Sequence, residues 1–155
     1  MKTTAVHYGS LTIPRRAQTL VDSAFAYLSR DALERSLIRR VEHSRVPHRI
    51  VIDHCGDDSY RADTRTIHWD PTSAMRTTGF GRQSPALGLG HELDHAAVSD
   101  DAFDLLASVP DRRFDNLEER RVILGSERHA ARTLHESTRD DHWGRLYRVA
   151  TPVSR

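Results

Sequence analysis

Two histidines four residues apart, His91 and His95, enclose Glu92 in the segment His-Glu-Leu-Asp-His. On an α-helix this spacing places both imidazoles on one face, about one turn apart, where two nitrogens can bind a single zinc ion. Glu92 lies about 100° around such a helix from His91, so it can take a proton from a water molecule that zinc activates. The segment therefore predicts a catalytic zinc site. The alternative is a pair of surface histidines on an ordinary helix.

A catalytic zinc site also needs a third protein ligand and one open position. Asp101 stands where the metzincin pattern has its third ligand, but Val98 replaces the glycine at which that pattern turns the chain. We therefore prefer a glutamate on a second helix, the gluzincin arrangement, and Glu118 and Glu119 open such a helix. Because they differ by about 100° around the helix, we expect one to bind zinc and favour Glu118. The alternative is that both are ordinary first-turn acids.

The zinc-binding segment falls on a helix predicted to begin at Ser84 and Pro85 and to run to about Val98. Serine is a favourable N-cap, and proline suits the first position of a helix. Small and apolar residues flank the two histidines on both sides, as expected for a helix that packs in a core. The metal ligands should therefore come from the interior of the protein.

The rest of the chain predicts an α+β, zincin-like fold, with helices packed on a small β-sheet. We expect further helices at 17–28, 33–41, 102–108 and 117–136, strands at 49–53 and 64–69, loops at 72–83 and 110–115, and an irregular polar tail at 137–155. Gly125 is a weak point inside the last helix. We expect one domain, 1–155, with flexible ends at 1–14 and 146–155.

Composition excludes several classes of protein. The chain has 155 residues with 23 basic and 22 acidic side chains, a net charge of +1, so we expect no nucleic-acid or membrane binding. It has no apolar stretch of membrane-spanning length and no apolar signal core at its N-terminus. Cys55 is the one cysteine, which excludes an intrachain disulfide and a cysteine-based zinc cluster. We expect a monomer.

Three segments, in this order, resemble the NleD-like zinc metallopeptidases, which are type III secretion effectors and related bacterial toxin domains: Thr66–Pro71, Ser84–Ala96 and Glu118–Ile123. The segment Arg139–Gly144 resembles a tail motif of that family. The resemblance covers about residues 50–145. It implies cleavage of a protein substrate, such as a host signalling kinase, by an effector that acts in the host cell cytoplasm.

Two residues of the tail motif, Arg139 and His142, are candidates for stabilising the oxyanion of the tetrahedral intermediate. The alternative for Arg139 is a surface ion pair with Asp140 or Asp141. Asp94 replaces the apolar residue expected inside the zinc motif. Its charge either influences substrate preference or pairs with an arginine.

Two other functions remain compatible with the same residues. One is a zinc hydrolase of a non-peptide bond, because zinc-activated water does not by itself select amides. The other is a non-catalytic zinc-bearing domain that binds a partner. We read the remaining histidines as surface or packing residues, and we do not expect Cys55 and its neighbour His54 to form a nucleophilic pair.

Overall fold

Strand β3 (His48–Ile52) lies at the centre of a five-stranded sheet in the computed structural model, which describes residues 5–155. The strand order is β1-β2-β3-β5-β4, and the other strands are β1 (Ala5–Tyr8), β2 (Leu11–Pro14), β4 (Ser59–Arg61) and β5 (Thr66–Trp69). Strands β2, β3 and β5 are parallel, whereas the edge strands β1 and β4 run antiparallel to their neighbours. The predicted strands at 49–53 and 64–69 correspond to β3 and β5.

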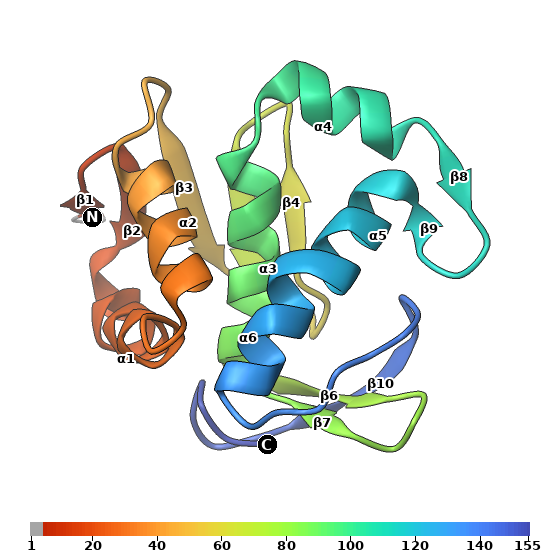
Figure 1. The fold of residues 1–155 in the computed structure, drawn as a ribbon. Helices are drawn as coiled ribbons and strands as arrows, with labels where there is room; N and C mark the ends of the chain where they lie inside the picture. The colour runs from red at the N-terminus through yellow and green to blue at the C-terminus, as the bar shows by residue number, and fades with distance from the viewer. Residues whose placement is uncertain (1–4) are drawn as a thin grey trace.

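Helices α1 (Gln18–Leu28) and α2 (Ala32–Glu42) connect β2 to β3, and in Figure 1 α2 lies in front of these strands with α1 below it. They confirm the two helices predicted for this region. Their buried apolar side chains join those of the sheet and of helix α3 (Pro85–Ala97) in one hydrophobic core. The protein is therefore an α+β domain in which helices pack on a mixed sheet.

Helix α3 runs through the middle of the molecule, between the sheet and the C-terminal helices (Figure 1). It begins as predicted, with Ser84 as the N-cap accepting a hydrogen bond from the Leu87 amide and Pro85 in the first turn. The indole of Trp69 donates to the Pro85 carbonyl, which ties the start of α3 to strand β5. Because 11 of its 13 residues are buried, the charged residues of α3 require partners inside the protein.

A second sheet has the order β10-β6-β7 and consists of β6 (Ser73–Thr77), β7 (Arg82–Gln83) and β10 (Gly144–Arg148). All its pairings are antiparallel, and it lies below α3 and α6 in Figure 1. The prediction of a loop at 72–83 and of an irregular tail at 137–155 was therefore wrong for 73–77, 82–83 and 144–148, which are strands. Strand β10, the partner of β6, lies about 70 residues away in the chain, so no local sequence pattern predicts this pairing.

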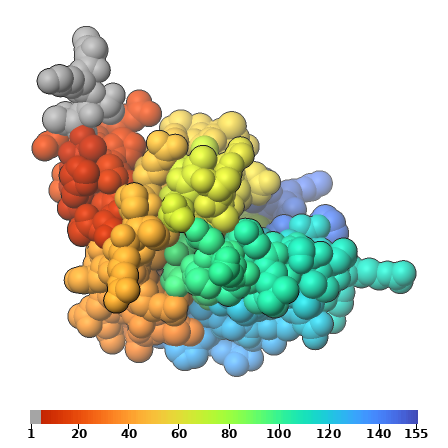
Figure 2. Space-filling model, turned by 90° about the horizontal axis from the view of Figure 1, so that it is seen from above, coloured from red at the N-terminus to blue at the C-terminus, as the bar shows by residue number. Residues whose placement is uncertain are grey.

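The chain continues through α4 (Asp100–Ala107), the hairpin of β8 (Pro110–Asp111) and β9 (Asp115–Asn116), and α5 (Leu117–Val122). A π-helical turn, Ile123–Glu127, then leads into α6 (Arg128–Thr133). The predicted single helix at 117–136 is interrupted at Gly125, whose φ of −100° and ψ of −106° are not helical. The predicted loop at 110–115 contains the hairpin, and the teal segment that includes it projects to the right in Figure 2.

The two ends that we expected to be flexible contain regular structure. Residues 5–14 form strands β1 and β2, and 144–148 form β10, while residues 1–4 lie outside the described part of the chain. Among residues 5–155, no helix has both the length and the apolar character needed to cross a membrane.

Glu34 of α2 is completely buried, and neither of its carboxylate oxygens has a hydrogen-bond partner among residues 5–155. The carboxylate lies so close to Gly90 of α3 that a Cβ atom at position 90 would come within 2.6 Å of Oε2. Burial, together with the charges of Asp94 and Asp31, raises the pKa of Glu34 to about 8. Glu34 is therefore a buried neutral acid at the contact between α2 and α3 at pH 7 and below.

Replacing Glu34 with glutamine is expected to weaken the pH dependence of stability. The pKa of Glu34 rises from 4.5 in an unfolded chain to about 8 on folding, so the folded state binds this proton more tightly. The resulting stability is complete below pH 4.5 and is lost as the pH rises through 8, at no more than ~1.4 kcal/mol per pH unit. Urea unfolding of both proteins between pH 5 and pH 8, with a chelator present, measures the difference. Parallel stability curves would contradict this interpretation.

Candidate metal centre

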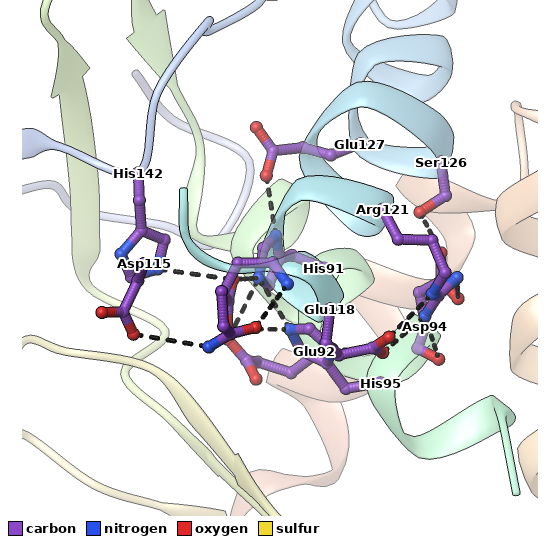
Figure 3. Close-up of polar contacts among 12 residues, drawn as sticks. His91, Glu92, Asp94, His95, Asp115, Glu118, Arg121, Ser126, Glu127 and His142 are labelled. Carbon is purple, nitrogen blue, oxygen red and sulfur yellow. Dashed lines mark hydrogen bonds and ion pairs between the residues drawn. The ribbon is translucent and has the colours of Figure 1, made fainter. Parts of the chain in front are cut away.

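Three potential metal ligands, His91 and His95 of α3 and Glu119 of α5, converge where these helices meet. Figure 3 shows the two histidines and the side chains around them. The Nε2 atoms of His91 and His95 lie 3.0 Å apart. The carboxylate of Glu119 bridges them, with Oε2 2.9 Å from Nε2 of His91 and Oε1 3.2 Å from Nε2 of His95. The histidines come from consecutive turns of one helix face, as their spacing predicts. Glu119 comes from the first turn of α5, where Asn116 caps the helix by accepting from the Glu119 amide.

The separations among these atoms fit a zinc ion. In a tetrahedral site with zinc–ligand distances near 2.0–2.1 Å, neighbouring ligand atoms are about 3.3 Å apart. Here the two Nε2 atoms are 3.0 Å apart, and they lie 2.9 and 3.2 Å from the two different oxygens of the Glu119 carboxylate. A small outward movement of the side chains would therefore admit the metal. Two imidazoles and one carboxylate are also a ligand set that zinc enzymes use, with the fourth position left for water or substrate.

The other ring nitrogen of each histidine faces a buried carboxylate. Nδ1 of His91 lies 2.7 Å from Oε2 of Glu127, and Nδ1 of His95 lies 2.9 Å from Oε1 of Glu118. A carboxylate at this position holds the proton on Nδ1, fixes the orientation of the ring and leaves the lone pair of Nε2 free for a metal. With no proton on either Nε2, the two lone pairs would face each other at 3.0 Å, so a proton or a metal ion must lie between the rings. The arrangement therefore suits a bound metal.

Hydrogen bonds to carboxylates shift the pKa of both histidines. Burial lowers the pKa of His91, but its hydrogen bonds to Glu119 and Glu127 outweigh burial and raise the pKa to about 10. The pKa of His95 is also raised, because Glu118 and Glu119 outweigh the effect of burial. Burial raises the pKa of Glu119, but contacts with three histidines hold it well below its usual value. The centre of the site therefore favours positive charge.

Acidic side chains outnumber basic ones around this centre. The acids are Glu92, Asp94, Glu118, Glu119 and Glu127, and the guanidinium groups that contact them are Arg121 and Arg139. With neutral imidazoles the acids exceed the guanidinium groups by three charges. Buried carboxylates require paired charge, and a divalent cation would compensate most of this excess.

Glu92 lies beside the proposed ligands but is not one of the three that converge. Its Oε1 is 4.0 Å from Nε2 of His91, and the side chain borders a cleft that His91, Arg139 and His142 also line. Burial raises the pKa of Glu92 above its usual value. A carboxylate of raised pKa at this position suits a group that accepts a proton and then returns it.

The geometry favours Glu119 over Glu118 as the third ligand, in contrast to our preference from the sequence. Both oxygens of Glu118 are engaged, Oε1 by His95 and Arg121 and Oε2 by Arg121. Burial raises the pKa of Glu118, but Arg121 and His95 together lower it to about 2. Glu118 therefore orients the His95 ring through its Nδ1 atom, opposite the Nε2 atom that faces Glu119. Asp101, the alternative ligand, is exposed in the first turn of α4 and is not part of the converging group.

Arg139 is buried against Glu127, not paired on the surface with Asp140 or Asp141. Its Nε and Nη2 donate to the two carboxylate oxygens of Glu127 at 2.8 and 2.7 Å. Asp140 instead pairs with Arg128. Two of the three nitrogens of Arg139 are thus committed to Glu127, although the residue still lines the cleft.

His142 is half-buried at the edge of the same site. Its Nε2 lies 3.3 Å from Oε2 of Glu119, and the residue lines the cleft. Of the two residues considered for oxyanion stabilisation, His142 is therefore the one with a ring nitrogen beside the converging ligands.

Asp94 pairs with an arginine, which was one of the two roles considered for it. Arg121 donates to its Oδ1 at 2.8 Å, and the Ser126 hydroxyl donates to its Oδ2. Arg121 also binds Glu118, so it links the zinc-motif helix to the helix that carries the carboxylates. Asp94 is buried and points toward Arg121 and Ser126 (Figure 3), and it is not among the residues that line the cleft.

Sequence reasoning missed Glu127. It lies eight residues after Glu119, which is about 80° away from a common face in a regular α-helix, and no spacing in the sequence identifies it. The interruption at Gly125 also made the direction of its side chain difficult to infer.

The other histidines do not join the site. His48 is buried, His129 and His68 lie near Asp31 and Asp53, and Cys55 is exposed and free. Comparison with protein-family models, with curated proteins and with solved structures found no match. The site's own geometry therefore carries the functional inference.

Proposed function

We propose that the protein is a zinc-dependent endopeptidase. His91, His95 and Glu119 would hold the metal, and Glu92 would act as general base and then as proton donor. The observation that carries the proposal is the convergence of three ligand residues beside a buried carboxylate on a cleft. The Nε2 atoms of the two histidines are 3.0 Å apart, and each lies within 3.2 Å of one carboxylate oxygen of Glu119. We further propose that the fold is zincin-like, because one helix carries both histidines and a neighbouring helix carries the third ligand.

Zinc, when bound, would polarise a water molecule and the substrate carbonyl in the open coordination position. The chain's own residues perform the remaining tasks. Glu118 and Glu127 orient the two imidazoles, and Arg139 holds Glu127 in place. Glu92, whose carboxylate lies 4.0 Å from His91, would accept a proton and then return it, and the His142 ring beside Glu119 would donate to developing negative charge.

The resemblance to NleD-like peptidases extends the proposal to the biological setting. It suggests an effector or toxin that cuts a protein of a host or target cell. Cleavage of a proteome-derived peptide library tests the reaction class: the zinc-loaded protein should produce new peptide termini, and a chelated sample should not. Zinc binding without new termini would favour a non-catalytic zinc domain or a hydrolase of another bond.

Zinc is expected to stabilise the apo-protein strongly. A ligand that binds only the folded state stabilises it by about 4 kcal/mol when its free concentration is 1,000 times its Kd. Thermal melts in buffered zinc measure this effect, with direct metal analysis of the purified protein. Magnesium should have little effect, because it prefers all-oxygen ligands. If zinc neither binds in one equivalent nor raises Tm, the proposal fails, whereas loss of the Tm shift in a His91→Ala variant would support it.

A further inference from the structure

Three arginines form a row across the second sheet. Arg145 of β10 is paired in register with Arg76 of β6, which in turn is paired with Arg82 of β7. Directly paired residues point to the same side of a sheet, so all three side chains lie on one face. All three are exposed. Like charges placed opposite one another in a sheet are destabilising, so this row is unfavourable for the fold itself.

None of these three guanidinium groups has a hydrogen-bond or ion-pair partner in the part of the chain that the structure describes. Other arginines of the same region are paired, for example Arg148 with Asp70 and Arg128 with Asp140. The row therefore leaves unneutralised positive charge on a protein whose net charge is only +1.

A hollow on this sheet combines two of the arginines with two aromatic side chains. Arg76, Arg145, Phe80 and Trp143 all line it. Phe80 is 79% exposed and Trp143 is 60% exposed, and these are the two most exposed aromatic side chains among the large hydrophobic residues of the described chain. Asp141 accepts from the Trp143 amide and from Thr78, which fixes the rim on which Trp143 stands.

Residues that line the hollow are adjacent in sequence to residues of the proposed metal centre and of its cleft. His142, whose ring reaches Glu119, immediately precedes Trp143. Met75 and Leu146 line the cleft beside His91 and Glu92, and each is adjacent in sequence to an arginine of the row. The same two strands therefore contribute to the cleft with one face and to the arginine row with the other.

We infer that the arginine row and the hollow are a docking surface for an acidic segment of a protein that contains apolar residues. Carboxylates of the segment would pair with Arg76, Arg82 and Arg145, and its apolar side chains would pack on Phe80 and Trp143. The inference that this surface binds a substrate rests on the proposed endopeptidase function. The inference that it binds an acidic segment does not, because none of its residues belongs to the proposed metal centre.

The intrinsic fluorescence of the full chain offers a direct test. Of its two tryptophans, Trp69 is completely buried, so changes in quenching by iodide report on Trp143. A short synthetic peptide of glutamate, glycine and leucine should protect Trp143 from iodide, and its glutamine counterpart should not. Binding should weaken as salt is added, because exposed charges are screened. It should be the same with and without zinc.

Matched variants make the test specific. The double variant Arg76→Ala, Arg145→Ala should bind the acidic peptide about tenfold or more weakly. Arg15→Ala, Arg16→Ala removes the same charge from two exposed arginines outside this sheet and should bind normally. Equal binding of the two peptides, or equal binding by both double variants, would overturn the inference. So would tighter binding of single-stranded DNA or phosphatidylserine vesicles. If the protein binds the peptide but does not bind zinc, the proposed peptidase function fails and the docking surface stands.

Discussion

Replacing Glu92 with glutamine is expected to abolish peptide cleavage while leaving zinc binding intact. Glutamine keeps the size of the side chain and removes its ability to take a proton. Loss of a general base costs about 10²–10⁴-fold in rate. Because Glu92 is not among the converging ligand atoms, the zinc Kd should change little. Cleavage of the peptide library and a zinc titration with a competing dye, performed on the same preparation, measure both quantities.

Glu34→Gln is the matched control for this experiment. It makes the same chemical change at another buried glutamate, which belongs to α2 and packs against Gly90 of α3. It should therefore retain cleavage. Equal loss in both variants would mean that disturbance of α3, and not loss of a base, explains the result. Cleavage that survives Glu92→Gln would remove Glu92 from the proposed reaction.

The positions of His91 and His95 on one helix face could be predicted from sequence because every determinant is local. The Ser84 cap, Pro85 and the spacing of His91 and His95 all lie within about three turns of one helix. The same is true of Asn116, which opens α5 and brings the glutamates to the site. Local caps and helical periodicity thus determine which helix faces contribute to the proposed metal centre.

The choice between Glu118 and Glu119 could not be made in this way. The two residues differ by about 100° around α5, and which one reaches Nε2 depends on how α5 packs on α3. That packing is set partly by Arg121, which engages Glu118 and Asp94 together. A contact among three residues from two helices leaves no single pattern in the sequence.

The second sheet was missed for a related reason. Strand β6 pairs with β10, and the segments are separated by all the helices that carry the site. Its residues also lack the run of branched and aromatic side chains that predicts a strand, as β3 has. As a consequence, the arginine row cannot be recognised from the sequence, where Arg76, Arg82 and Arg145 are isolated charges.

Removing Glu119 is expected to weaken zinc binding far more than removing Glu118. Glu119 contributes an oxygen to the converging ligands. Glu118 contacts His95 at Nδ1, the ring nitrogen that faces away from those ligands. Loss of a carboxylate that orients a ligand costs about 10–100-fold in metal affinity, and loss of a ligand should exceed that range. Zinc titrations of Glu119→Ala and Glu118→Ala, each compared with the parent protein, measure the two effects. Asp101→Ala is the control and should bind zinc normally.

The Glu118→Ala variant requires a separate measurement of folding. Glu118 is buried and pairs with Arg121, so its removal leaves a guanidinium group and a buried histidine without their partner. We expect reduced stability in the apo-protein, and circular dichroism at each titration point separates unfolding from weak binding. Glu118→Gln retains an oxygen that can accept from Arg121 and should recover part of the loss. A larger loss of affinity in Glu118→Gln than in Glu119→Gln would exchange the roles of the two glutamates. Equal small losses, with a large loss in Asp101→Ala, would instead move the third ligand to α4.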